Sequence, residues 1–303
     1  MTNLLLAVIL NILATINNIH RMPVNGHFFL YFCENIGKIV SIMNKKSSRL
    51  YCFSPTVMLI TFIFESFSAV FAIFKYKPSK IRTLIILLLM SLAGFQAAEF
   101  MVCGTEHFSG MDWARFGYLA ITLLPPLGLH LAHEISGKKA GILVKTSYLT
   151  CVLFSIYFVF VSKSVFTGEN TCRANYSVFN TPNGVATLLY TLYYYGWLFI
   201  AVFFCWSQIS KMLRENNRGI LRIFISRSKK LNKIINSENL RKISALKWLI
   251  SGYVAFILPT TIVNIVNPST IEGIPSIMCG FAVLMAIVLI GFVAPRTLEL
   301  KKK

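Results

Sequence analysis

Seven long apolar runs constrain the fold of this 303-residue chain more than any other feature of its sequence. A helix needs about 20 apolar residues to cross the hydrocarbon core of a bilayer. Only helices suit runs of this length, because lipid cannot satisfy exposed backbone polar groups. The runs cover residues 56 to 74, 83 to 103, 114 to 133, 142 to 162, 185 to 207, 248 to 266 and 275 to 294. We therefore expect an all-α, polytopic membrane protein built as a bundle of seven transmembrane helices.

The composition agrees with a membrane protein. The chain is 55% hydrophobic and 14% charged, whereas soluble domains average about 25% charged residues. Its net charge of +19 would suggest nucleic acid if the basic residues formed one soluble patch. They lie instead in loops between the apolar runs, where they fit anionic lipid. We expect the lipid bilayer as a partner and no nucleic acid.

The basic residues are concentrated in alternate connections between the runs. Cytoplasmic loops collect Lys and Arg, so this asymmetry orients the chain. The basic connections hold Lys75, Lys77, Lys80 and Arg82; Lys138, Lys139 and Lys145; eleven residues from Lys211 to Lys247; and Arg296 with Lys301, Lys302 and Lys303. The opposite loops hold Arg115, Lys163 and Arg173. The pattern predicts a cell-membrane protein whose first span enters from outside and whose carboxyl terminus is cytoplasmic.

The first 55 residues fit this topology badly. The apolar run from residue 4 to 16 is short for a span and lacks the basic flank of a signal peptide. We interpret residues 1–55 as a poorly specified extension, or as a start assigned upstream of a true start near Met58. Residues 56–296 then form the membrane domain, with a basic loop at 208–247, and residues 297–303 form a short basic tail.

The third run contains two adjacent prolines, Pro125 and Pro126. At mid-membrane they must remove backbone hydrogen bonds and kink the helix. Pro259 is expected to bend the sixth span in the same way. His130, more than a turn inside the membrane, is either a hydrogen-bonded packing residue or a ligand.

The next residues along the third run are expected at the cytoplasmic interface. His133 and Glu134 are interpreted as interfacial side chains that reach headgroups and water. Glu134 and Lys138 have the spacing of a helical ion pair.

Polar and aromatic residues gather in the outer halves of several runs. One interpretation is a cavity that binds a small molecule between helices; for the aromatic residues an interfacial belt is the alternative. The candidate ligand-binding residues are Glu65, Gln96, Glu99, Tyr194, Trp197, Thr260 and Asn264.

Glu65 lies near the middle of the first run, where a charge costs about 3 kcal/mol or more on insertion scales. We expect its carboxyl group to be neutral or hydrogen-bonded, with Gln96 as a partner at comparable depth. Glu99 could instead reach Arg115. A polar clamp between helices and a functional acid both remain open for these residues.

The seven cysteines include no C-x-x-C pair that would suggest a metal or redox centre. Cys103 and Cys172 fall on the same predicted side, where a disulfide could form in an oxidising compartment. Two free thiols are an equal alternative, and Cys279 is a rival partner. We predict no metal site, no cofactor and no catalytic residues.

The stretch "WARFGYLAITLLPPLGLHLAHEISGK" carries a family resemblance. It resembles the third helix of the seven-helix membrane region found at the amino terminus of many bacterial sensor histidine kinases, with a Trp, an R-x-x-Y-x-x-I pattern and a mid-helix Pro-Pro. The segments "FQAAEF" (95–100), "RKISALKWLISGYVAFILP" (241–259) and "GIPSIMCGFAVLMAIVLIGFVAPR" (273–296) are similar to that family as well. The resemblance covers roughly residues 58 to 296 and implies a sensing bundle that transmits a signal inward.

The resemblance stops short of the kinase. Only "TLELKKK" follows Arg296, so we expect no kinase activity in this chain and an output through a separate protein. The basic segment 211–247 would contact that cytoplasmic signalling protein, and a second copy of the chain is a further candidate partner. The predicted function is a stand-alone receptor or sensor for a small or lipidic ligand bound in the outer half.

Two other classes of function are weaker. An enzyme is disfavoured because membrane di-iron enzymes and seven-helix zinc hydrolases need histidines that the spans lack, and "HLAHE" (130–134) has the wrong order for a zinc helix. The last run has no Lys for a retinal Schiff base. A small-solute transporter remains the alternative, because prolines at mid-membrane with polar residues beside them are typical of transporter sites.

Overall fold

The computed structural model describes residues 55–104, 110–161, 171–172, 177–178, 185–214, 237–266 and 274–301. The predicted amino-terminal extension, except for residue 55, and most of the predicted basic loop, residues 215–236, lie outside the described residues.

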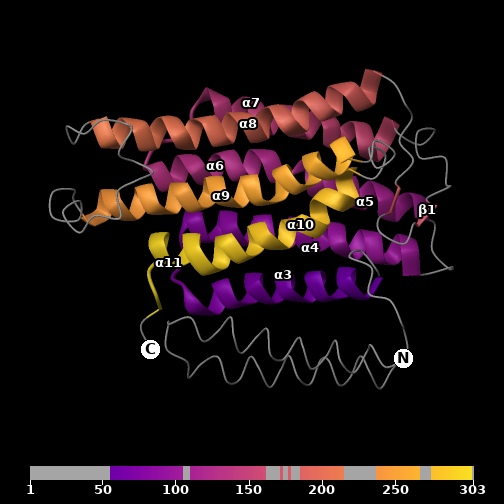
Figure 1. Ribbon diagram of the computed structural model, residues 1–303, viewed down its shortest axis with the longest axis horizontal. Coiled ribbons are helices and arrows are strands. Elements are labelled where there is room, and N and C mark those ends of the chain that lie inside the picture. The colour runs from indigo at the N-terminus through magenta and orange to yellow at the C-terminus, as the bar shows by residue number, and fades with distance from the viewer. Residues whose placement is uncertain are drawn as a thin grey trace. The chain divides into compact units, whose positions relative to one another are not determined.

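Within the described residues the chain is all-α and forms seven helical rods (Figure 1). Two of the rods are interrupted, one by a break and one by a π-helical turn. The helices are α3 (Pro55–Lys75), α4 (Lys80–Gly104), α5 (Gly110–Thr122), α6 (Leu124–Ser136), α7 (Ile142–Ile156) with η1 (Tyr157–Val161), α8 (Val185–Arg214), α9 (Ser237–Val266), and α10 (Ile274–Val288) with η6 (Leu289–Val293) and α11 (Ala294–Thr297). A minimal antiparallel pair, β1 (Thr171–Cys172) and β2 (Ser177–Val178), joins Thr171 to Val178 and Cys172 to Ser177.

Five of these helices are long and apolar enough to cross a membrane. The five segments are Met58–Lys75, Lys80–Met101, Ile142–Val161, Leu188–Arg214 and Glu238–Ile262. The prediction of an all-α protein with several membrane passes is confirmed at this level. The third predicted span is divided between α5 and α6, and the seventh contains the shorter apolar segment Phe281–Thr297.

The sixth predicted span is the carboxyl-terminal part of a longer helix. The apolar run suggested residues 248–266, but α9 begins at Ser237. Its first turns hold Glu238 paired with Lys242 at the favourable helical spacing. These polar turns extend the helix beyond the apolar segment.

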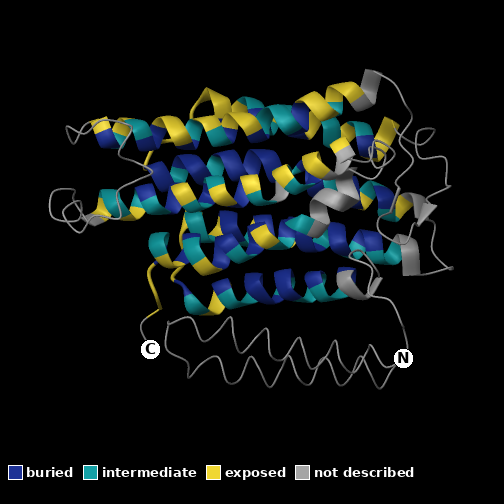
Figure 2. Ribbon diagram, viewed as in Figure 1, coloured by how far each residue is buried: buried dark blue, intermediate teal, exposed yellow. Residues whose placement is uncertain are grey.

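α6 is the central rod of the bundle. It packs against α4, α7, α8 and α9, and eleven of its thirteen residues are buried. Figure 2 shows α6 almost entirely in the colour of buried residues, whereas α7 and α8 carry many exposed ones. The exposed residues of α7, η1 and α8 are largely apolar, for example Leu149, Phe160 and Phe203. An outward apolar surface of this kind suits lipid, and it leaves the polar parts of α6 facing protein.

α6 ends in a turn that requires glycine. Gly137 has φ = 73°, the left-handed region that other residues rarely adopt. Its N–H donates to the Glu134 carbonyl (3.1 Å) and the Lys138 N–H donates to the His133 carbonyl (3.1 Å). This pair of bonds satisfies two carbonyl groups that the helix end would otherwise leave free.

One end of the bundle holds the α3–α4 connection, the α6–α7 connection, the start of α9 and α11 (Figure 1). We call it the basic end, because the described connections there carry Lys75, Lys77, Lys138 and Lys139.

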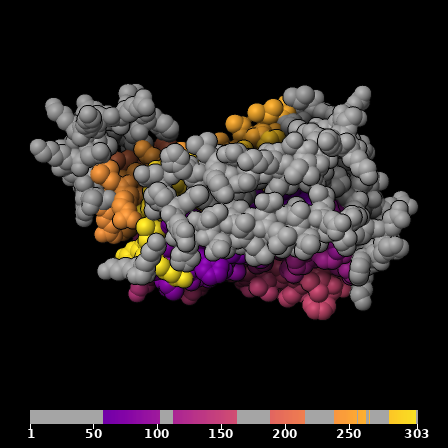
Figure 3. Space-filling view, turned by 90° about the horizontal axis from the view of Figure 1, so that it is seen from below, coloured from indigo at the N-terminus to yellow at the C-terminus, as the bar shows by residue number. Residues whose placement is uncertain are grey.

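The carboxyl-terminal residues are docked at the basic end. Leu300 forms an antiparallel bridge with Tyr76, and Lys77 donates to the Glu299 carbonyl at 2.9 Å. The Lys77 ammonium also lies 2.8 Å from the Glu299 carboxylate. Figure 3 shows these yellow terminal residues beside the indigo α3–α4 region. The part of the predicted basic tail that is described therefore pairs with the connection between the first two rods.

Burial under this contact affects Tyr76 itself. Its side chain is buried, and burial raises the pKa of its hydroxyl to about 12. Arg82 donates to the Tyr76 carbonyl at 2.9 Å, which holds the turn closed from the α4 side. The α3–α4 connection is thus a packed element and not a free loop.

Candidate functional site

The interruption between α5 and α6 follows directly from the two prolines. In a continuous helix the N–H groups of residues 125 and 126 would donate to the carbonyls of Ile121 and Thr122. Proline has no N–H, so both carbonyls lose their helical partners. α5 ends at Thr122, and α6 begins at Leu124 with Pro125 and Pro126 in its first positions, where proline is tolerated. The two helices are separated by Leu123 alone, whose backbone stays in the right-handed helical region (φ −74°, ψ −21°).

The freed carbonyl of Thr122 is satisfied from the neighbouring rods. The Tyr193 hydroxyl of α8 donates to it at 2.7 Å, and the Cys151 thiol of α7 donates to it at 3.5 Å. The Thr122 hydroxyl donates to the Tyr118 carbonyl at 2.6 Å and lies 3.1 Å from the Tyr190 hydroxyl. The break in the third rod is therefore held by side chains of α7 and α8, and α8 contributes the stronger donor.

An aromatic cluster surrounds this break. Tyr118 of α5 stacks on Phe158 of η1 with ring centroids 4.9 Å apart, and Phe158 meets Tyr190 of α8 edge to face at 5.0 Å. Phe154 of α7 lies 4.9 Å from the Tyr193 ring. Tyr193 and Tyr194 are only 6% and 7% exposed. An interfacial belt would leave such rings at the lipid and water boundary, so these two tyrosines belong to the protein interior.

The remaining candidates from α8 and α9 lie in different surroundings. Trp197 donates from its indole N–H to the Thr150 hydroxyl of α7 at 3.0 Å. Thr260 is buried in α9, which continues through Pro259 as one helix from Ser237 to Val266. The side chain of Asn264 lies outside the described residues. Trp197 therefore joins α8 to α7, and Thr260 belongs to the interior of the bundle.

The candidates on α3 and α4 are two glutamates and a glutamine, and they form a separate group. Glu65, Gln96 and Glu99 are all buried, and the Glu99 carboxyl is the charged group that acts electrostatically on Glu65. Both carboxylate oxygens of Glu65 lack a hydrogen-bond partner within the described residues. The expected hydrogen bond from Gln96 to Glu65 is therefore wrong. Figure 1 shows α3 on one side of the bundle and α7 with α8 on the other, so the predicted ligand residues fall into two groups.

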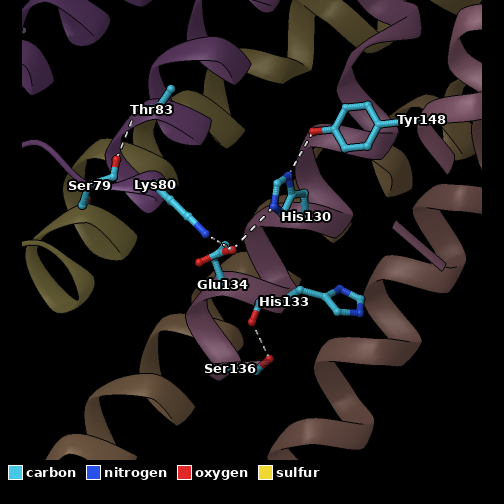
Figure 4. A network of polar contacts seen from close by, with 8 residues as sticks. All are labelled: Ser79, Lys80, Thr83, His130, His133, Glu134, Ser136 and Tyr148. Carbon is cyan, nitrogen blue, oxygen red and sulfur yellow. Dashed lines mark hydrogen bonds and ion pairs between the residues drawn. The ribbon is translucent and has the colours of Figure 1, made fainter. Parts of the chain in front are cut away.

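A polar network joins three rods near the basic end (Figure 4). The His130 ring lies 3.2 Å from the Tyr148 hydroxyl of α7 through Nδ1 and 3.6 Å from the Glu134 carboxylate through Nε2. The same carboxylate lies 4.0 Å from the Lys80 ammonium of α4. His130 thus takes part in a network that ties α6 to α4 and α7.

His133 behaves differently from the expectation that it reaches headgroups and water. It is buried, its ring stacks on Phe204 of α8 with centroids 3.8 Å apart, and its Nδ1 lies 2.9 Å from the Leu129 carbonyl. The expectation was wrong because α6 is surrounded by other helices over its whole length, and a single sequence does not give that burial.

The predicted disulfide lies outside the described side chains, since neither Cys103 nor Cys172 has a described side-chain environment. Among the described residues Cys151 and Cys205 are buried free thiols, and no group of three His, Cys, Asp or Glu residues could hold a metal ion. Arg115, which the sequence suggested as a partner of Glu99, lies 3.3 Å from Asp112.

Sequence reasoning missed the roles of Tyr193 and Cys151 at the break, and of Gly128 beside it. A Cβ atom at Gly128 would overlap the Tyr253 hydroxyl of α9, so glycine allows this tyrosine to approach α6. The position of a proline in the sequence identifies the carbonyl that loses its hydrogen bond, which lies four residues earlier. The residue that satisfies that carbonyl depends on which helices are neighbours.

Comparison with known proteins adds no relative. No protein-family model, no curated protein and no solved structure matches the chain.

Proposed function

We propose that this protein is a seven-pass membrane receptor, which binds a small or lipidic ligand in the half of the bundle opposite the basic end. The five long apolar helices supply five passes. In the proposed topology α5 with α6 and α10 with α11 supply the other two. The basic end faces the cytoplasm, because Lys and Arg concentrate on that side, and the segment 211–247 contacts a separate signalling protein.

The observation that carries the proposal is the bond between the Tyr193 hydroxyl and the Thr122 carbonyl. It makes the position of α6 relative to α5 depend on α8, because the prolines have removed the backbone bonds that would fix it. A switch needs an element with two arrangements, and a ligand shifts their populations only if it binds one of them better. A rod interrupted at mid-membrane and held by the Tyr193 hydroxyl and the weaker Cys151 thiol is suited to that role.

The signal would travel along α6. A ligand among the buried side chains of α8 and α9, such as Tyr194 and Thr260, would change the packing of the aromatic cluster beside Tyr193. α6 would then shift at the break and carry Glu134 relative to Lys80 at the basic end. The proposed activity is binding and signalling and not catalysis, in line with the resemblance to the membrane region of sensor histidine kinases.

The proposal is tested with purified protein in lipid nanodiscs and a panel of small apolar and lipidic compounds. Compounds that raise the thermal unfolding midpoint are measured for affinity against Thr260→Val and against Thr261→Val, its exposed neighbour on α9. We expect Thr260→Val to weaken binding about tenfold or more, the range for a lost buried polar contact, and Thr261→Val to leave it unchanged. Equal affinities for both variants would contradict the proposed ligand site.

A small-solute transporter is the second candidate. It is favoured by Glu65, which is fully buried and has no hydrogen-bond partner within the part of the chain that the structure describes, since intramembrane acids mark ion and substrate pathways. Flux measurements in proteoliposomes separate the two functions. A receptor ligand changes the distance between spin labels at Lys139 and Lys242 without crossing the bilayer. Saturable uptake of the stabilising compound would identify a transporter instead.

A further inference from the structure

Four buried polar side chains lie on the neighbouring helices α3 and α4. We call them the α3–α4 polar group: Glu65, Ser68, Gln96 and Glu99, which are 0%, 1%, 2% and 1% exposed. Residues three apart on a helix share a face, which pairs the first two on α3 and the last two on α4. α3 and α4 pack against one another along the bundle. Glu65 and Ser68 therefore share one face of α3, and Gln96 and Glu99 share one face of α4.

The direction of the side chains brings the two acids together. Helical side chains lean toward the amino-terminal end of their own helix. α3 and α4 run in opposite directions (Figure 1), so Glu65 leans toward the level of Glu99, and Glu99 leans back toward Glu65. The electrostatic effect of Glu99 on Glu65 agrees with this approach.

Two members of the group have unused polar atoms. Both carboxylate oxygens of Glu65 and the hydroxyl oxygen of Ser68 are buried without a hydrogen-bond partner within the described residues. Buried polar groups are normally hydrogen-bonded, and buried charges are paired or coordinate a metal. Three oxygens on one helix face that satisfy none of these conditions point to a ligand.

Among the described residues, α3, α4 and α10 supply no basic residue at the level of Glu65, and Arg115 of α5, which packs against α4, lies 3.3 Å from Asp112. α10 packs against both α3 and α4, and it contains no Lys, Arg or His. The basic residues of α3 and α4 are Lys75, Lys80 and Arg82, which lie at the basic end.

We propose that the α3–α4 polar group binds a monovalent metal cation. Carboxylate, hydroxyl and amide oxygens are the hard ligands that such ions take. The Glu65 carboxylate, which has no hydrogen-bond partner within the described residues, matches a single positive charge. Only its two oxygens and the Ser68 hydroxyl are unused, fewer than the six to eight oxygens that Ca²⁺ takes. The site goes beyond the proposed function and does not depend on it, since a receptor or a transporter could hold the ion.

The test measures the thermal unfolding midpoint of the full chain in detergent, with NaCl, KCl or choline chloride at constant ionic strength. The protein should gain several degrees, saturably, in Na⁺ or K⁺ and not in choline. Glu65→Gln should lose this response, and Ser68→Ala should weaken it. Glu238→Gln, which alters an exposed acid at the start of α9, should keep it.

Glu65→Gln removes a buried charge, so we expect the variant to fold, and Ser68→Ala gives an independent reading if it does not. An equal midpoint in all three salts would overturn the proposal, as would an unchanged metal-ion response in Glu65→Gln. A midpoint that depends on pH alone would identify a proton site and overturn the proposal as well. None of these results bears on the receptor test, which uses α9 variants and organic ligands.

Discussion

At the scale of single residues, the molecule is organised by backbone groups that cannot pair within their own helix. Pro126 leaves the Thr122 carbonyl without its helical donor, and Tyr193 supplies the replacement at 2.7 Å. Inside a membrane no water can satisfy such a group, and each unsatisfied one costs several kcal/mol. The replacement donor is therefore a structural necessity that also links α8 to the third rod.

Gly128 tests how tightly α6 and α9 are packed beside this break. Its replacement by alanine would place a Cβ atom over the Tyr253 hydroxyl, and overpacking of this kind costs about 1 to 3 kcal/mol. We expect Gly128→Ala to lower the thermal unfolding midpoint in detergent.

The matched control is Gly196→Ala in the interior of α8, where an added Cβ would meet no atom within 4 Å. In a helix interior, alanine is more favourable than glycine by about 0.5 to 1 kcal/mol. This variant should therefore be as stable as the original or more stable. Equal behaviour of the two variants would show that α9 does not approach α6 as described.

At this scale the sequence predicted which backbone hydrogen bonds the prolines remove. It did not predict which side chains replace those bonds. A missing N–H is a property of residue 126 alone, so the break follows from chemistry. Tyr193 was one of several tyrosines in the fifth run, and nothing in that run distinguishes the one that reaches Thr122. The same limit explains why Glu65 was expected to bond to Gln96.

At the scale of elements, α6 differs most from what its composition suggested. Its sequence contains two histidines and a glutamate within five residues, which is typical of a helix end at the membrane surface. The structure surrounds this segment with α4, α7, α8 and α9, so His133 stacks on Phe204 and Glu134 faces Lys80. The positions of the apolar segments could be predicted from hydropathy, but the full length of α9 and the neighbours of each helix could not.

The coupling of α6 to α8 can be measured through Cys151, the second donor at the Thr122 carbonyl. Tyr193→Phe removes the hydroxyl donor and leaves only a weak thiol donor, at a cost of about 1 to 3 kcal/mol for an unsatisfied buried carbonyl. We expect looser packing of α7 against the break. In a variant with Cys151 as its single cysteine, a membrane-permeant thiol reagent should then react several-fold faster.

Tyr157→Phe is the control for this measurement, because it makes the same change in η1, where the Tyr157 ring meets Phe158 but its hydroxyl has no hydrogen bond to the described residues. It should leave the reaction rate of Cys151 unchanged. If Tyr193→Phe also left that rate unchanged, α8 would not hold the break, and the proposed switch would lose its physical basis.

At the scale of the whole molecule, hydropathy predicted the class of fold. The distribution of Lys and Arg predicted which connections lie at the same end of the bundle. The apolar runs agree with the helices because a span is a local property of about 20 residues. The described connections at the basic end include the Lys-bearing α3–α4 and α6–α7 turns (Figure 1). The docking of residues 298–301 on the α3–α4 connection was not predictable, because it joins residues more than two hundred positions apart.

The functional account depends most on which end of the bundle faces the cytoplasm, and cysteine accessibility measures this directly. Asp112→Cys at the start of α5 and Lys139→Cys in the α6–α7 connection place single, exposed thiols at opposite ends of the third rod. With a membrane-impermeant maleimide, we predict labelling of Asp112→Cys in intact cells and of Lys139→Cys only after the membrane is opened. Labelling of Lys139→Cys in intact cells, with Asp112→Cys protected, would contradict the account, because the proposed ligand half would then face the cytoplasm.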